Sequence, residues 1–384
     1  MNNFTYLNPV KVVFGKDTIE QLTDLIPNTE NILMVYGGGS IKKNGVYDQV
    51  NSALKNHKVY EFSGVEPNPT YETCMNAVEY VKKHKINFIL AVGGGSVLDA
   101  VKFIAAATKV INKDPWGILT GEVKIEAALP LGSVLTLPAT GSEMNCNSVI
   151  SKKATDEKLA FSNPLVYPVF SIVDPQTNYS LPLRQTINGI VDSYVHVMEQ
   201  YMISNDNTPL QDRQAEAIIQ TLIEIAPTVL SEPENYDARA NLCWCATQAL
   251  NGLISCGVVT DWSTHGIGHE LTAFYGIDHA QSLSVVMPRL WNNQREIKKD
   301  KLIQYGRRIF GITSKNSNEV INEAIAKTEE FFRSCGVKTK LSEYNVDSAE
   351  AADKISRRFK ERNLNIGEKG QITPEDVKDI LSKC

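Results

Sequence analysis

The stretch Ala91-Val92-Gly93-Gly94-Gly95-Ser96-Val97-Leu98-Asp99-Ala100-Val101-Lys102 contains three consecutive glycines. They join the end of a short apolar segment to residues whose apolar side chains recur at helical spacing. We interpret the stretch as a strand, a tight turn and a helix. Glycines let a backbone approach a phosphate closely, and the free N–H groups at a helix start bind anions. The stretch therefore predicts one unit of a parallel α/β sheet. Its turn either binds a phosphate or needs glycine only for its backbone conformation.

The same tetrapeptide ends a second apolar segment, where Val35-Tyr36 runs into Gly37-Gly38-Gly39-Ser40. Neither copy has the GxGxxG or GxxxxGK spacing of other phosphate-binding loops. A third loop, Thr136–Glu143, follows another apolar segment and adds hydroxyl groups and a glycine. Because the glycine turn recurs at a second strand end, we favour a bound nucleotide over a purely structural turn. The third loop would supply donors to its pyrophosphate or ribose.

Short strand-like segments alternate with helix-like segments through the first 180 residues, which predicts βαβ units. The expected strands are Val10–Phe14, Asn31–Tyr36, Lys58–Phe62, Asn87–Val92, Ser133–Leu137 and Val169–Val173, and the expected helices are Thr18–Ile26, Tyr71–His84 and Val97–Thr108. After residue 180 the pattern changes to long helices without strand alternation, such as Arg184–Tyr201, Leu210–Leu230, Ala238–Ile254 and Glu319–Ser334. We predict a dinucleotide-binding α/β domain at residues 1–180, an all-helical domain at 181–384, and a ligand between them.

Composition excludes several classes of partner. The 384 residues carry a net charge of −5, with 39 basic and 44 acidic side chains interspersed, so we expect neither nucleic acid nor an anionic membrane as a partner. No apolar run reaches the length of a membrane span, and the first residues do not resemble a signal peptide. Seven scattered cysteines without a CxxC pair indicate reduced thiols and a cytoplasmic protein.

The first glycine turn bears on the choice of nucleotide. A site selective for NAD usually places a carboxylate beside the adenosine ribose. Residues 37–47 contain no Asp or Glu, whereas they contain Ser40, Lys42 and Lys43. A hydroxyl group and two cations suit a 2′-phosphate, so we favour NADP over NAD, although both lysines could simply solvate a helix face.

Four of the six histidines lie within 84 consecutive residues. Two pairs of candidate ligands in this region are each spaced four residues apart. Asp192 and His196 lie one helical turn apart, as do His265 and His269, and His279 follows ten residues later. One carboxylate and several neutral imidazoles are ligands for Zn²⁺ or Fe²⁺. The spacing predicts a metal site but leaves open which four of these five residues bind. The two remaining histidines, His57 and His84, stand among lysines and are predicted to be solvated.

A zinc peptidase is the main rival for such a metal site. It would need HExxH, but Ala273 stands where the second histidine of His269-Glu270-Leu271-Thr272-Ala273 is required. A metallohydrolase would also leave the glycine turns unexplained. A nucleotide and a metal together indicate hydride transfer, with the metal polarising a carbonyl group.

The ordered set of motifs resembles the iron-containing (group III) alcohol dehydrogenases, and most of all their butanol dehydrogenase and NADPH-dependent aldehyde reductase branch. The matching pieces run nearly end to end: Val13–Lys16, Tyr36–Ser40, Glu66–Pro69, Gly93–Asp99 with Lys102, Ala139–Glu143, Asp192–Glu199 and Asp261–Ala280. One departure is Asp278-His279-Ala280, where much of the wider family has Pro-His-Gly.

The resemblance implies a dehydroquinate synthase-like fold, an α/β dinucleotide-binding domain followed by an all-helical domain, with the metal between them. It implies that the metal ligands are Asp192, His196, His265 and His279. It implies catalytic roles for His269, as a polar or proton-relay residue beside the nicotinamide, and for Asp99. Cofactor contacts are implied for Gly37, Gly38, Ser40, Asn68, Gly94, Gly95, Ser96, Asp99, Thr136, Thr140, Asn145 and Lys158.

By this resemblance we expect an NADP(H)-dependent alcohol dehydrogenase that interconverts aldehydes and primary alcohols, with one Fe²⁺ or Zn²⁺ ion and a homodimeric assembly. A glycerol-type polyol dehydrogenase or a dehydroquinate synthase-like lyase would share this architecture. A nucleotide-binding protein without catalytic activity is the alternative from a different class.

Overall fold

The computed structural model describes residues 1–203 and 207–384, which form two compact units. The sheet unit consists of Leu7–Pro182 and Glu232–Thr247, and the helical unit consists of Met1–Tyr6, Leu183–Ser231 and Gln248–Cys384. The division into domains at residues 180 and 181 stays a prediction. None of the helices in the described residues is both long and apolar enough to cross a membrane.

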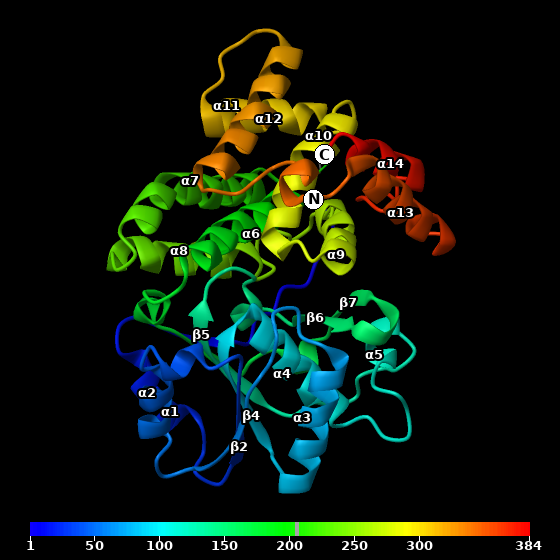
Figure 1. The fold of residues 1–384 in the computed structure, drawn as a ribbon. Coiled ribbons are helices and arrows are strands. Elements are labelled where there is room, and N and C mark those ends of the chain that lie inside the picture. Colours follow the sequence, from blue (N-terminus) through cyan, green and yellow to red (C-terminus); the bar gives the residue numbers. More distant parts are fainter. Residues whose placement is uncertain (204–206) are drawn as a thin grey trace. The chain divides into compact units, whose positions relative to one another are not determined.

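A six-stranded parallel sheet with the strand order β1-β8-β5-β4-β2-β3 forms the centre of the sheet unit. Figure 1 shows its helices on either side of these strands. The predicted parallel sheet is confirmed, and each of the six expected strands is present within two residues of its expected start. Their bounds are β1 Lys11–Phe14, β2 Asn31–Tyr36, β3 Lys58–Phe62, β4 Phe88–Gly94, β5 Leu131–Leu137 and β8 Phe170–Val173.

The strand order reverses between β2 and β4, because β3 lies on one side of β2 whereas β4, β5 and β8 follow on the other. Ligands of open α/β sheets bind beside the carboxyl ends of the strands at such a reversal. The two glycine turns end β2 and β4, and the loop Thr136–Glu143 begins at the end of the neighbouring strand β5. The topology therefore brings the three predicted loops to one edge of the sheet.

Two apolar cores cover the two faces of the sheet. Leu33 and Val35 belong to the core beneath α3 and α4, whereas Ile32 and Met34 belong to the core beneath α1 and α2. Successive strand residues point to opposite faces, so the residues from Ile32 to Val35 must all be apolar. The helices of this unit are α1 Leu22–Leu25, α2 Val46–Ala53, α3 Tyr71–His84, α4 Gly95–Ala107, α5 Gly117–Thr120 and α8 Tyr236–Ala249.

An antiparallel hairpin of β6 Asn147–Lys152 and β7 Glu157–Ser162 was not predicted from the sequence. Its strands are short and rich in Ser, Asn and Lys, so they lack the apolar alternation of a half-buried strand. The turn between them ends at Asp156, whose φ is 49°. The hairpin matters because it carries Lys158.

The helical unit contains three of the four long helices expected after residue 180, whereas most of the fourth, α8, belongs to the sheet unit. Helix α6 is buried almost continuously from Gly189 to Tyr201. The helices of the helical unit are α6 Leu183–Tyr201, α7 Pro209–Ser231, α9 Ser263–Tyr275, α10 His279–Asn293, α11 Lys299–Phe310, α12 Ser317–Ser334, α13 Ser348–Glu361 and α14 Pro374–Ser382. Short 3₁₀ helices lie at Thr18–Gln21, Ser40–Lys42, Ser142–Met144, Lys153–Thr155, Pro164–Val166, Pro175–Asn178 and Leu341–Tyr344.

Two expected helices are shorter than predicted. The segment Thr18–Ile26 forms a 3₁₀ helix at Thr18–Gln21 followed by the single turn of α1 at Leu22–Leu25. Helix α8 ends at Ala249 rather than near Ile254, because Gly252 takes a φ of +87° that a helix cannot contain.

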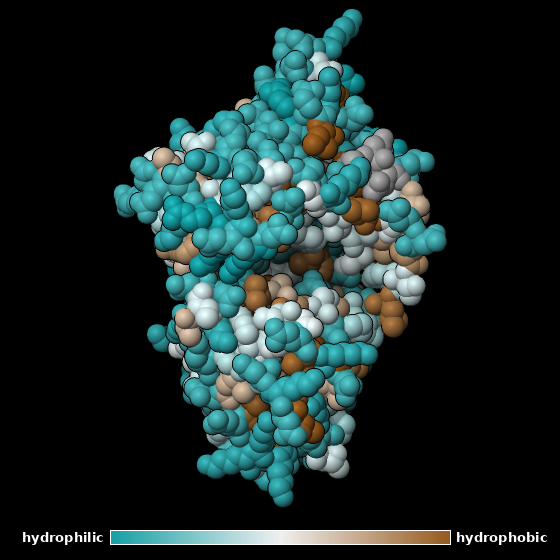
Figure 2. Space-filling view, turned by 90° about the vertical axis from the view of Figure 1, so that its right-hand side faces the viewer, coloured by the Kyte–Doolittle hydropathy of each residue, from teal (hydrophilic) through white to brown (hydrophobic). Residues whose placement is uncertain are grey.

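The surface is mostly hydrophilic on the face shown in Figure 2, with apolar side chains largely scattered, as is normal for a folded chain.

Candidate functional site

Helix α6 supplies two of the proposed metal ligands. Asp192 and His196 lie one turn apart, and both are buried, at 3% and 4% exposure. His265 is the third residue of α9, His269 follows it by one turn, and His279 is the first residue of α10. Three helices of one unit therefore carry all five candidates that the sequence singled out.

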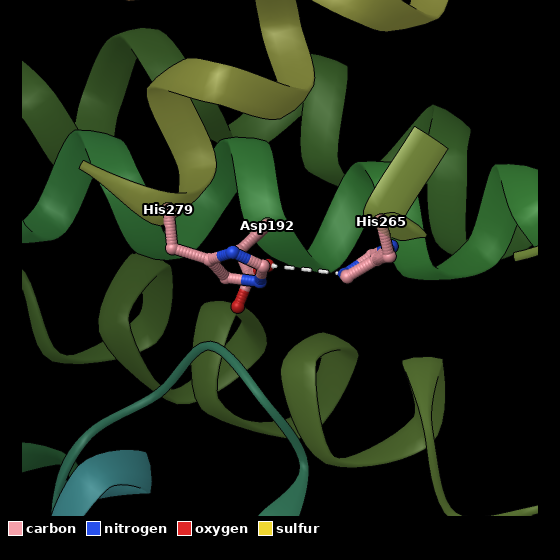
Figure 3. Close-up of side chains that lie close together, drawn as sticks. All are labelled: Asp192, His265 and His279. Carbon is pink, nitrogen blue, oxygen red and sulfur yellow. Dashed lines mark ion pairs between the residues drawn. The ribbon is translucent and has the colours of Figure 1, made fainter. Parts of the chain in front are cut away.

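The carboxylate of Asp192 lies near the side chains of His265 and His279, as Figure 3 shows. Its Oδ1 is 3.8 Å from Nε2 of His196, 3.9 Å from Nε2 of His265 and 3.6 Å from Nε2 of His279. The ligand atoms of Asp192, His265 and His279 all lie within 4.8 Å of one another. We name Asp192, His196, His265 and His279 the metal cluster.

The donor set of the metal cluster fits a divalent ion. Ligand atoms at the usual 2.0–2.1 Å from a tetrahedral zinc ion are about 3.4 Å apart, close to the distances around Asp192. Asp192 Oδ1 is buried and accepts no hydrogen bond from the described residues. A buried carboxylate oxygen is costly without a donor or a cation, so a bound ion would account for its position.

His269 lies beside the metal cluster. Its ring centre is 5.2 Å from that of His279 and 6.0 Å from that of His265. The ring of Trp262 packs against the cluster as well, at 5.4 Å from His265 and 6.2 Å from His196. One side of the cluster is thus covered by an aromatic side chain.

Glu199 is a buried residue of this site that the sequence argument did not single out. Its Oε1 accepts the backbone N–H groups of Thr264 at 2.6 Å and His265 at 3.2 Å, and its Oε2 contacts His265 Nδ1. Burial raises the pKa of Glu199 well above its usual range and Asp261 raises it further, while the two backbone donors lower it. The spacing from Asp192 to His196 to Glu199 places all three on one face of a helix, and this signal could have identified Glu199.

Asp278, the residue that departs from the family pattern, is held by α6. Its Oδ2 accepts a hydrogen bond from Asn188 Nδ2 at 3.1 Å and lies 3.3 Å from Arg184 Nη1. Since His279 follows directly, these contacts fix the start of α10 relative to the helix that carries Asp192.

His57 and His84 are not the solvated residues that the sequence predicted. His57 Nε2 lies 2.8 Å from the carbonyl oxygen of Ile26, and His84 packs against the rings of Tyr60 and Tyr80. Both side chains are half-buried: the partner of His57 comes from a segment distant in sequence, and Tyr80 lies one helical turn before His84 on α3.

In the sheet unit, the second glycine turn packs directly against the loop after β5. A Cβ atom added at Gly95 would lie 2.5 Å from Thr140 Oγ1, and one at Gly94 would lie 2.9 Å from Cβ of Leu137. These two glycines therefore have a packing reason to be glycine. Gly38 differs, because a Cβ there would meet nothing within 4 Å, which leaves room for a ligand.

A buried hydrogen-bond network holds the loop after β5. Lys102 Nζ donates to Ser142 Oγ at 2.7 Å, to Asn145 Oδ1 at 3.0 Å and to the carbonyl oxygen of Asn147 at 2.9 Å. Ser142 Oγ in turn donates to Asp99 Oδ1 at 3.0 Å. Burial raises the pKa of Asp99 to about 6 and lowers the pKa of Lys102 to about 8.

The remaining predicted cofactor residues lie around this network. Asn145 Nδ2 donates to the carbonyl oxygen of Gly141 at 2.9 Å, so its side chain shapes the loop. Lys158 Nζ donates to Asn68 Oδ1 at 2.9 Å, which joins the hairpin to the segment before α3. Thr136 is buried in β5, and Ser96 is partly exposed in the first turn of α4.

At the first glycine turn, Ser40 is exposed and begins a 3₁₀ helix. An acidic residue does approach this turn from β3, which the sequence argument missed. Glu61 accepts hydrogen bonds from the hydroxyl groups of Tyr36 at 2.8 Å and Tyr47 at 2.6 Å, and lies 3.8 Å from Lys42 Nζ. Its carboxylate is thus engaged by three partners.

Comparison with known proteins now defines the class. Residues 9–175 match the family described as iron-containing alcohol dehydrogenase, and residues 186–384 match the C-terminal part of the Fe-containing alcohol dehydrogenase family. The chain belongs to the iron-containing alcohol dehydrogenase family.

Particular relatives cover almost the whole chain. It is 52% identical over 375 residues to the NADPH-dependent aldehyde reductase YqhD of Escherichia coli, covering 97% of both chains. It is 42% identical to the probable NADH-dependent butanol dehydrogenase 1 of Bacillus subtilis, covering 99% of both. The crystal structure of E. coli YqhD superposes with a TM-score of 0.97 at 51% identity, covering 100% of this chain and 98% of that one.

Proposed function

We propose that this protein is an NADP(H)-linked, metal-dependent alcohol dehydrogenase that interconverts aldehydes and butanol-like primary alcohols of a broad range by hydride transfer. The observation that carries the proposal is the metal cluster, one carboxylate among three imidazoles, in a chain of the iron-containing alcohol dehydrogenase family. The NADPH-dependent aldehyde reductase YqhD, at 52% identity, supports both the substrate class and the cofactor.

Asp192, His196, His265 and His279 would hold one divalent ion, and iron and zinc both accept this ligand set. When bound, the ion would act as a Lewis acid toward the carbonyl oxygen, and the dinucleotide would supply or accept the hydride. The charge of Asp192 lowers the net positive charge of the site and so tempers its Lewis acidity. Trp262 covers part of the cluster with apolar surface and so limits the access of water to it.

The sheet unit would hold the dinucleotide at the ends of β2, β4 and β5. The open space over Gly38 leaves room for a phosphate, and the network of Lys102 and Asp99 fixes the loop that presents Thr140. Ser40, Lys42 and Lys43 would receive the 2′-phosphate. Because Glu61 is engaged by two tyrosines and Lys42, its charge is partly compensated beside this turn.

His269 is proposed as the proton relay. It is half-buried and lies next to His279, so it can exchange a proton between the site and water. Asp99 is proposed to act by holding the loop after β5 in place. Its carboxylate accepts hydrogen bonds from Ser142 in that loop and from the backbone N–H of Val149 at 3.2 Å.

Anaerobic purification, metal analysis and assays with propanal, butanal and pentanal would test this function. We expect stoichiometric iron or zinc and faster oxidation of NADPH than of NADH. The variant His279→Ala should lose both metal and turnover, whereas the matched variant His84→Ala should keep them, because His84 packs against tyrosines of the sheet unit. Turnover by His279→Ala without bound metal would contradict the metal role, and faster oxidation of glycerol than of butanol would favour a polyol dehydrogenase.

A homodimer is also proposed. Strand β1 is at the edge of the sheet. Its last residue, Phe14, forms an aromatic pair with Trp244 of α8; the two side chains are exposed at 40% and 43%, and their ring centres are 5.9 Å apart. An exposed strand edge with apolar side chains can pair with a second copy. Light scattering should give a dimer for the native protein and a weaker dimer for Phe14→Lys. A native monomer would contradict the proposal.

We propose a cytoplasmic location as well. All seven cysteines are free thiols, in agreement with a reducing compartment. Fractionation of cells that express the tagged protein should place it with cytoplasmic markers, and recovery in another fraction would contradict this location.

A further inference from the structure

The start of helix α9 is capped by a residue from another helix. The N-cap position, Trp262, makes no side-chain cap hydrogen bond. Instead, Glu199 of α6 accepts the N–H groups of Thr264 and His265 through its Oε1. These donors belong to the first turn, where helices leave backbone N–H groups unsatisfied, and a carboxylate there also interacts favourably with the helix dipole.

The second oxygen of the same carboxylate contacts the ring of His265 at Nδ1. The two backbone N–H donors favour the ionised form of Glu199, which can only accept hydrogen bonds. A neutral imidazole has one protonated nitrogen, so contact with the ionised carboxylate requires the proton to be on Nδ1. The lone pair is then on Nε2, the atom that lies 3.9 Å from Asp192 Oδ1. The contact therefore selects both the tautomer and the orientation that a metal ligand needs.

Glu199 is well placed to hold this geometry rigidly. It is 5% exposed and lies seven residues after Asp192 on the same helix. Its backbone carbonyl oxygen also accepts the N–H of Asp261 at 2.9 Å, just before α9 begins. Asp261 in turn accepts the N–H of Ser263 at 3.0 Å and is paired with Lys298.

We propose that Glu199 is a positioning residue of the metal centre: it ties the start of α9 to α6 and fixes His265 with Nε2 free for the ion. The inference rests on the proposed metal-dependent function. It predicts that Glu199 controls metal affinity although it does not belong to the ligand set.

The substitution Glu199→Gln distinguishes a role of Glu199 in orienting His265 from a role as a helix cap alone. The amide oxygen can still accept the two backbone N–H groups, so the cap is kept. The amide NH₂ group then faces Nδ1 and requires it to be an acceptor, which moves the ring proton to Nε2 and removes the ligand lone pair. The matched control is Glu216→Gln, which alters another buried carboxylate of the same unit that accepts from Tyr201 and Arg308.

Binding of Co²⁺ and Zn²⁺ to the metal-free full-length proteins, measured by chelator competition, tests the proposal without any activity assay. We expect Glu199→Gln to weaken binding about 10- to 100-fold and to change the visible spectrum of bound Co²⁺, while Glu216→Gln keeps the native values. Native affinity and an unchanged Co²⁺ spectrum in Glu199→Gln would overturn the proposal. A native protein that binds neither ion would instead overturn the metal-dependent function.

If Glu199→Gln does not fold, NMR of the metal-free native protein gives a second test. With ¹⁵N-labelled histidine, the ring of His265 should be in the Nδ1–H tautomer. Its signals would be assigned by their loss in His265→Gln. The Nε2–H tautomer for His265 would overturn the proposal.

Discussion

Gly95 and Thr140 approach so closely that a methyl group on residue 95 would lie 2.5 Å from the threonine hydroxyl oxygen. The first residue of α4 and the loop after β5 are therefore fitted to each other. Both belong to the proposed cofactor site, so their contact links the stability of the sheet unit to the binding of the dinucleotide.

A methyl group at residue 95 and one at residue 38 should have different effects. Gly95→Ala must displace Thr140, so it should lower the free energy of unfolding by about 1–3 kcal/mol and with it the melting temperature. It should also weaken NADPH binding. Gly38→Ala meets no protein atom within 4 Å, so it should leave the melting temperature unchanged yet still weaken NADPH binding. Calorimetry and fluorescence titration with NADPH would measure both. Unchanged NADPH affinity in Gly38→Ala would place the phosphate elsewhere.

A negative charge at the first glycine turn should reverse the cofactor preference. Ser40→Asp would place a carboxylate where we propose the 2′-phosphate, so kcat/KM with NADPH should fall and the preference should shift toward NADH by at least about tenfold, equivalent to about 1.4 kcal/mol. The control Ser52→Asp adds the same charge at an exposed position of α2 and should leave the preference unchanged. An equal shift in both variants would indicate a general effect of charge instead of a phosphate contact.

Lys102 should make the stability of the protein depend on pH in the alkaline range. Its folded-state pKa of about 8 is below the ordinary value of 10.5, so between these values the unfolded chain holds a proton that the folded chain releases. The free energy of unfolding should therefore gain a contribution on the order of 3 kcal/mol as the pH rises from 8 to 10.5. Urea unfolding at several pH values would show this rise in the native protein and its loss in Lys102→Met. Parallel curves for the two proteins would exclude a depressed lysine pKa.

Asp278 should support His279 through Asn188. Removing either side chain frees the start of α10, so Asp278→Ala and Asn188→Ala should each weaken Zn²⁺ binding several-fold, within the range of about 10–100-fold known for residues behind metal ligands. The double variant should bind Zn²⁺ no more weakly than Asp278→Ala alone, because Asn188 acts through its hydrogen bond to Asp278. Additive losses of Zn²⁺ affinity would show that the two residues act independently.

The parallel sheet could be predicted because its strands are apolar on both faces, as β2 shows with Ile32 to Val35 divided between two cores. The hairpin that carries Lys158 could not, because its polar strands lack alternation. The candidate ligands were visible as helical spacings, and Glu199 follows the same spacing. Glu61 was out of reach, because it approaches the first glycine turn only through the register that pairs Met34 with Glu61.

Eight residues of one helix, from Asp192 to Glu199, carry two of the proposed ligands and the carboxylate proposed to orient a third. Each residue of an α-helix is rotated by about 100° from the last. A single inserted or deleted residue within this segment would therefore turn part of the set away from the rest, whereas a change of length in a surface loop would leave it intact. Surface loops can therefore change length in evolution, whereas this segment has to keep its length.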